Sequence, residues 1–142
     1  MNVFTSLENH LRASNLFASE QFDCWVQGGE ISASSEFTAD GLTLGEMHTD
    51  GFYSIERFNG DEKALLGQVM CWLINNDIEE TPTFDVDPLG NGLIDIIIGL
   101  RLSEKIDAVE DEDGPLEVKG VRYKLGEHTV WYAESVNVTG AT

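Results

Sequence analysis

Residues Gly92–Ala108, GLIDIIIGLRLSEKIDA, carry the clearest β-strand pattern in the chain. Alternate positions form an unbroken apolar row, made of Ile94, Ile96, Ile98, Leu100 and Leu102. The row between them is mixed and consists of Asp95, Ile97, Gly99 and Arg101. Because successive side chains of a strand point to opposite faces of a sheet, the apolar row predicts a side that faces the core. The mixed row then faces a partner protein, solvent or a helix of the same chain, and the sequence leaves these alternatives open.

The residues before this strand predict a helix, a hairpin and a further strand. Apolar residues at helical spacing predict a first helix that reaches to about Asn15; they are Val3, Phe4, Leu7 and Leu11. Gly28 and Gly29 separate two short strand-like runs and predict a tight hairpin turn. Residues 32–51 are rich in Ser, Thr, Gly and Asp, which predicts either a flexible loop or a long hairpin. Alternation over Phe52–Phe58 predicts a strand.

A second helix is predicted to begin at Asp61, whose carboxylate can cap free backbone N–H groups. Its apolar stripe consists of Leu65, Leu66, Val69, Met70 and Leu73. On its other side the small residues Gly67 and Cys71 would let another backbone come close, so both are candidate contact residues. A short strand around Phe84, an acidic loop at residues 107–114 and strand-like segments to either side of Gly126 follow. This order predicts one α+β domain over residues 1–142, with two main helices packed on a mostly antiparallel sheet.

The composition indicates a folded, strongly acidic protein. Apolar residues make up 42% of the chain, and 26 acidic against 8 basic residues give a formal charge of −18. Such a charge excludes stable binding to nucleic acid or to an anionic membrane. Thirteen of the 26 acids fall between Asp77 and Glu117, which predicts one strongly negative face or end. The N-terminal residues have no signal-peptide pattern, and no apolar run is long enough to span a membrane, so we expect the protein to stay in a cytoplasm.

Motifs for catalysis or metal binding are missing from the sequence. The acidic run EDEDG at residues 110–114 places Gly120 at the closing position of a calcium loop, where a glutamate is required. The histidines His10, His48 and His128 lack zinc spacing, and the chain has no nucleophile elbow or phosphate-binding loop. We therefore expect no enzyme activity, no metal and no cofactor. Two cysteines and three tryptophans lie within apolar runs and are predicted to be buried first, with one tryptophan facing a partner as the alternative: Cys24, Cys71, Trp25, Trp72 and Trp131.

Segment Asp61–Asp107 as a whole has a helix with a late tryptophan, a short strand and turn, and then the long strand. The residues that carry the pattern are Trp72, Leu73, Asp95, Ile96, Leu102, Ser103, Glu104 and Lys105. This segment resembles the tail completion protein R family of P2-like contractile-tailed phages. The resemblance covers about a third of the chain well, and Leu7–Arg57 more loosely.

The resemblance implies a structural protein of the virion tail that is present in the host cytoplasm during assembly. Such a subunit ends tube and sheath growth at the head-proximal end and prepares the tail for head joining. Its implied partners are further copies of itself in a ring, hexameric in similar tail terminators, together with tube, sheath and head–tail connector proteins. A ring needs subunit contacts, for which the candidates are Asp95, Ile97, Arg101, Gly67 and Cys71.

A negative channel would let DNA pass a tail ring without binding to it, because like charges repel. The candidate channel residues are Asp107, Glu110, Asp111, Glu112 and Asp113. The alternative function is an acidic binding module that imitates nucleic acid and inhibits a basic partner protein. That module would need carboxylates along a rigid face, at about one per 1.7 Å, whereas the sequence predicts the EDED run in a loop.

Overall fold

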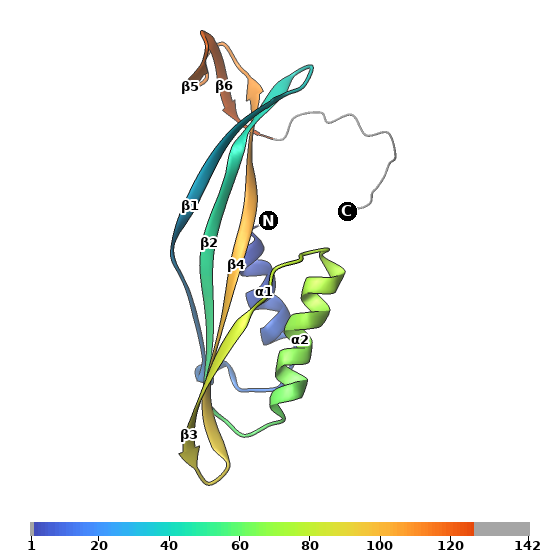
Figure 1. Ribbon diagram of the computed structural model, residues 1–142, viewed down its shortest axis with the longest axis vertical. Coiled ribbons are helices and arrows are strands. Elements are labelled where there is room, and N and C mark those ends of the chain that lie inside the picture. Colours follow the sequence, from blue (N-terminus) through green and yellow to red (C-terminus); the bar gives the residue numbers. More distant parts are fainter. Residues whose placement is uncertain (1, 127–142) are drawn as a thin grey trace. The chain divides into compact units, whose positions relative to one another are not determined.

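A computed structural model describes residues 2–126 as two helices, a short 3₁₀ turn and six strands. The elements are α1 (Val3–Arg12), η1 (Ser19–Gln21), β1 (Phe22–Phe37), β2 (Gly41–Phe58), α2 (Glu62–Asn75), β3 (Thr83–Gly90), β4 (Leu93–Glu110), β5 (Leu116–Val118) and β6 (Val121–Leu125). The strands form an antiparallel sheet in the order β1-β2-β4-β6-β5, and β3 also pairs with β4 (Figure 1). The predicted α+β class with two helices is confirmed. The strand-like segment after Gly126, with His128 and Trp131, lies outside the described residues.

The chain forms two compact units. Among the residues that the structure describes, unit 1 comprises residues 2–30 and 48–104, and unit 2 comprises residues 31–47 and 105–126. Strands β1, β2 and β4 contribute residues to both units. Residues 32–51 lie in β1, in β2 and in the short turn between them.

The core of unit 1 lies between the two helices and one face of the sheet (Figure 1). Leu7 and Leu11 of α1 and Leu65 and Val69 of α2 are buried there. The sheet contributes Ile96, Ile98, Leu100 and Leu102, all at most 3% exposed, and Ile94 packs against the cluster. Burial of each such side chain contributes about 1.5–3 kcal/mol. The apolar row of the long strand therefore faces the core, as its alternation predicts.

Polar contacts fix where the helices begin and how they meet. The side chains of Asn2 and Asp61 accept hydrogen bonds from backbone N–H groups in the first turns of α1 and α2, which confirms the predicted cap at Asp61. The indole N–H of Trp72 donates to Ser6 Oγ at 3.1 Å and ties α2 to α1. Trp72 is a core residue, 4% exposed, as predicted.

The predicted hairpin turn at Gly28-Gly29 is wrong, because β1 continues through both glycines to Phe37. Gly28 and Gly29 have φ angles of +59° and +152°, which are typical of a β-bulge as well as of a turn. A Cβ on Gly29 would meet the carbonyl oxygen of His48 in the neighbouring strand. The two glycines therefore allow the backbone of β2 to come close. The hairpin turn lies instead at residues 38–40, where the Thr38 N–H donates to the Gly41 carbonyl at 2.9 Å.

Unit 2 has a small core of its own, in which Leu42, Ala108 and Tyr123 are buried. Strand β6 pairs with the end of β4 from Ala108 to Glu110, and with β5 on its other side. The predicted acidic loop at 107–114 is therefore too long. Asp107 and Glu110 belong to β4, because β6 supplies hydrogen-bond partners there, and the loop begins only at Asp111.

Candidate interaction surfaces

The face of the unit 1 sheet that points away from the helices carries an apolar centre. The ring of Trp25 on β1 stacks on that of Phe52 on β2, with centroids 5.8 Å apart. The Phe52 ring lies over Gly99 of β4, whose missing Cβ would come within 3.3 Å of it. Ile97 lies two residues before Gly99 on the same face. We call this surface the open face; within residues 2–126 no helix covers it, and Trp25 and Ile97 are 38% and 39% exposed.

Carboxylates of β3 and β4 border the apolar centre of the open face. Asp85 of β3 lies directly opposite Ile97, and Asp87 directly opposite Asp95. Residues that face each other in antiparallel strands share a face, so these acids border the apolar centre, and the Asp87–Asp95 pair is mutually repulsive. Arg101 forms an ion pair with Glu30, which lowers the pKa of that carboxyl through the hydrogen bond and the guanidinium charge.

Helix α2 is apolar on two sides. Its inner side packs in the core, whereas Gly67, Met70, Cys71 and Ile74 form a second stripe at i, i+3, i+4 and i+7. Met70 and Ile74 are 54% and 74% exposed, and Cys71 is exposed. Apart from the helix's own backbone and adjacent residues, no described atom lies within 4 Å of the place where a Cβ on Gly67 would be. We call this surface the outer stripe; helices that are apolar all round are ordinarily buried on all sides.

An apolar groove of about 220 Å³ adjoins the outer stripe. Leu66, Val69 and Met70 of α2 line one side, and Phe84 and Ile98 lie on the sheet side. Phe84 is half exposed because β3 pairs only with β4 among the described residues. The groove therefore extends the apolar surface of α2 towards the edge of the sheet.

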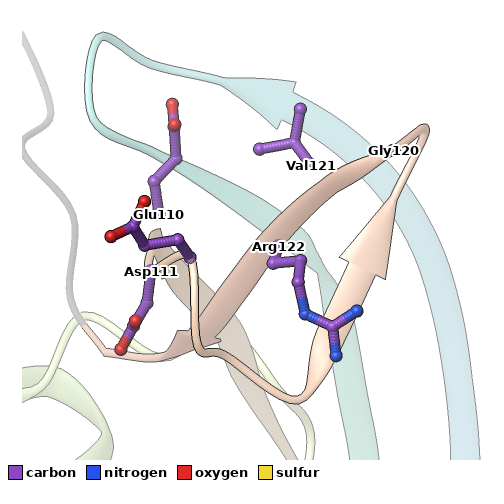
Figure 2. A pocket seen from close by; sticks show the side chains of 6 residues that line it. Glu110, Asp111, Gly120, Val121 and Arg122 are labelled. Atoms are coloured by element: carbon purple, nitrogen blue, oxygen red, sulfur yellow. The ribbon is translucent and has the colours of Figure 1, made fainter.

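Unit 2 presents an acidic surface. A shallow depression of about 410 Å³ is lined by Glu110 at the end of β4, by Asp111 of the loop that follows and by Val121 and Arg122 of β6. Figure 2 labels these side chains. Arg122 Nε donates to the Gly114 carbonyl at 2.8 Å, so this cation is used in fixing the loop. Glu112 and Asp113 are exposed in the same loop. By contrast, Asp107 is half-buried and accepts a hydrogen bond from Thr43 Oγ1 at 2.7 Å.

Three further features of residues 2–126 concern metal ligands, membrane spanning and the two cysteines. In that range no group of three or more His, Cys, Asp or Glu side chains is placed to hold a metal ion. Neither helix of the described chain is long and apolar enough to cross a membrane. Burial, with Glu8 close by, raises the pKa of the half-buried Cys24 thiol to about 11. The prediction that both cysteines are buried is wrong for Cys71, which points outward from α2 and not into the core.

The comparisons with known proteins decide the family. The sequence model of the family described as P2 phage tail completion protein R (GpR) matches residues 1–127. The chain belongs to this family. It is also similar to an uncharacterized 19.2 kDa protein from the rep–hol intergenic region of Haemophilus phage HP1 (strain HP1c1), with 28% identity over 127 residues. That alignment covers 82% of this chain and 76% of the relative. No solved structure matches the chain significantly.

The residues that resemble the tail completion family hold the fold together. Asp95 Oδ1 accepts the backbone N–H of Arg57 at 2.9 Å, where Arg57 has a φ of +50° and β2 ends. Glu104 Oε1 accepts the N–H of Val3 at 3.1 Å at the start of α1, and Ser103 Oγ lies 2.7 Å from His48 Nδ1. Asp95 therefore has a structural task besides its position on the open face.

The predicted contact residues fall on two different surfaces of the tail completion protein. Asp95, Ile97 and Arg101 lie on the open face, and Gly67 and Cys71 belong to the outer stripe. The sequence reasoning missed the other apolar members of these surfaces, which are Trp25, Phe52, Met70 and Ile74. The prediction that places Met70 in the inner stripe of α2 is wrong, because its side chain is 54% exposed. Trp25 is 38% exposed, so burial is wrong for this residue, and a partner-facing tryptophan stays a prediction. The signal that could have identified Met70 and Ile74 is the absence of charged residues in α2 after Lys63.

Proposed function

We propose that this phage tail completion protein acts at the head-proximal end of the tail, ends tube and sheath growth there, and prepares the tail for head joining. Family membership over residues 1–127 is the observation that carries this proposal. Its partners are then further copies of itself, the tube and sheath proteins and the connector proteins of the head. Assembly takes place in the host cytoplasm, and the finished protein remains in the virion tail.

We also propose that the subunits form a ring. A ring requires a heterologous contact, in which two different patches of the same subunit meet on neighbouring copies. Support comes from the two apolar surfaces of unit 1, the open face and the outer stripe, which have no partner among the described residues. Ile97 and Gly67 are the proposed central residues of the two patches.

The acids of unit 2 are proposed to line the channel of this ring. Glu110, Glu112 and Asp113 are exposed, and the whole chain carries a charge of −18. DNA that passes through the tail would be repelled by these carboxylates and would not be held.

The test of the completion function is negative-stain microscopy of tails assembled with and without the protein. Without it, we expect tails of irregular length, or tails of normal length that fail to join heads. Adding back the purified protein should restore both properties. Tails that reach normal length and join heads in its absence would overturn the proposal.

The channel proposal has a separate test. The double variant Glu112→Gln, Asp113→Asn removes two charges from the loop, and Glu79→Gln, Glu80→Gln removes two charges after α2 as a matched control. Both variants should complete tails, but only the loop variant should slow DNA release from the particle, because the channel then repels phosphate less. Equal release rates for the two variants would place the loop away from the DNA path.

A further inference from the structure

The two apolar surfaces of unit 1 differ in charge. Helix α2 has a single carboxylate, Glu62 at its first residue, and carries one lysine and no acid from Lys63 to Asn75, in a chain with 26 acids. Two copies with a charge of −18 each repel one another wherever acids meet acids. The outer stripe of α2, whose residues carry no acid, is therefore the surface that another acidic copy can approach with the least repulsion.

The open face has the complementary character. Its apolar centre of Trp25, Phe52 and Ile97 can bury a helix stripe, and its border contains Asp85, Asp87 and Asp95. Asp87 and Asp95 face each other across β3 and β4, so a cation brought near them relieves a repulsion that the isolated subunit retains.

Small residues allow the two surfaces to come close. A sheet can lie near the helix backbone at Gly67 and Cys71, and Gly67 has free space beside it. On the sheet side, Gly99 has no side chain, so the Phe52 ring can lie over it and forms the surface that a partner would contact. Met70 and Ile74 flank the small residues and would lose their exposed area in the contact.

We propose that α2 of one copy lies with its outer stripe on the open face of the next copy's sheet. The occupant of the open face is thus a second copy of this chain. The inference rests on the proposed ring and adds which two surfaces meet. The two surfaces lie on opposite sides of the unit 1 sheet, because Ile98 faces α2 while Ile97 points away from it. A contact between opposite sides repeats from copy to copy and does not end at a dimer.

The test uses the exposed thiol of Cys71 as one half of a disulfide. A second cysteine is placed on the open face by Ile97→Cys, Asp85→Cys or Thr83→Cys, each as a separate variant. Disulfides need Cα atoms closer than about 7 Å, so three positions sample the contact. Tails assembled with each variant are oxidised and separated on a non-reducing gel.

At least one variant should give a ladder from dimers up to the closed ring, because every subunit carries both halves of each link. Cys71→Ser in the same variant should abolish the ladder, although Cys24 is retained. Glu20→Cys, which introduces an exposed cysteine elsewhere in unit 1, should give no ladder. A urea unfolding midpoint equal to that of the wild-type protein would confirm for each variant that the fold is intact.

The outcomes separate this inference from the function on which it rests. Rings visible on tails, with no ladder from any open-face position, would overturn the pairing of surfaces and leave the ring in place. Dimers alone, linked through Cys71 on both copies, would also overturn it. Tails that complete normally and carry no ring would overturn the ring as well, and tails that complete normally without the protein would overturn the completion function.

Discussion

The two rows of β4 offer a direct test of the sequence argument, through Ile96→Ala and Ile97→Ala. The two residues are neighbours with the same side chain in the same strand, so the intrinsic cost of alanine in a strand is nearly equal for both. They differ in environment, since Ile96 is 0% and Ile97 39% exposed. Any difference in the free energy of unfolding therefore measures which row faces the core.

Ile96→Ala removes three buried carbon groups at about 0.8 kcal/mol each, or about 2.4 kcal/mol of transfer free energy. The cavity left in the buried cluster of unit 1 adds to this, so we expect a total of about 3–4 kcal/mol. Ile97→Ala loses only about three fifths of the transfer free energy, or about 1.5 kcal/mol, and leaves no enclosed cavity.

Urea unfolding followed by tryptophan fluorescence provides the assay, because Trp25 and Trp72 both lie in unit 1. With a slope of about 2 kcal/mol per molar urea, the midpoints should fall by about 1.7 M for Ile96→Ala and about 0.7 M for Ile97→Ala. Light scattering must first show that the protein is a monomer. In a ring, a contact between subunits at Ile97 would contribute to the measured free energy of unfolding. Equal midpoints for the two variants in the monomer would refute the assignment of the rows.

Three further variants or treatments test other contacts of unit 1. Burial raises the pKa of Tyr53, so the unfolded chain ionises first and stability should fall as pH rises above about 10; Tyr53→Phe should lose this part of the alkaline slope, and an unchanged slope would contradict the assignment. Gly99→Val should cost about 1–3 kcal/mol in urea unfolding, because the Phe52 ring must move, and a cost near zero would show that the ring is free to shift. In the free subunit a maleimide should label exposed Cys71 much faster than Cys24, whose thiol is half-buried with a raised pKa, as mass spectrometry of the labelled peptides can establish; equal rates would contradict the exposure of the two thiols.

Local patterns determined much of the fold because they depend on neighbours in the chain. The alternation in Gly92–Ala108 identified the core row of β4, and the helical spacing with Asp61 as cap identified α2. The order of helix, hairpin, strand and helix was sufficient for the α+β class. The resemblance in Asp61–Asp107 was sufficient for the family.

Tertiary structure decided the features that local rules cannot distinguish. Positive φ angles at Gly28 and Gly29 suit a turn and a bulge equally, and only the approach of His48 in β2 selects the bulge. The acids at Asp107 and Glu110 look like a loop until β6 supplies the hydrogen bonds that extend β4.

The sequence left open what covers the row of β4 that contains Ile97. The structure shows how much of this row other parts of the same chain cover. Alternation alone identifies two faces of a strand but does not say what covers each of them. Both helices pack on the Ile96 side, so within residues 2–126 the Ile97 side keeps an apolar surface in solvent. Alternation within a strand depends only on the strand's own residues, so it indicates which side chains are apolar. The element that covers these side chains comes from elsewhere in the chain or from another molecule, so the strand's pattern cannot identify it.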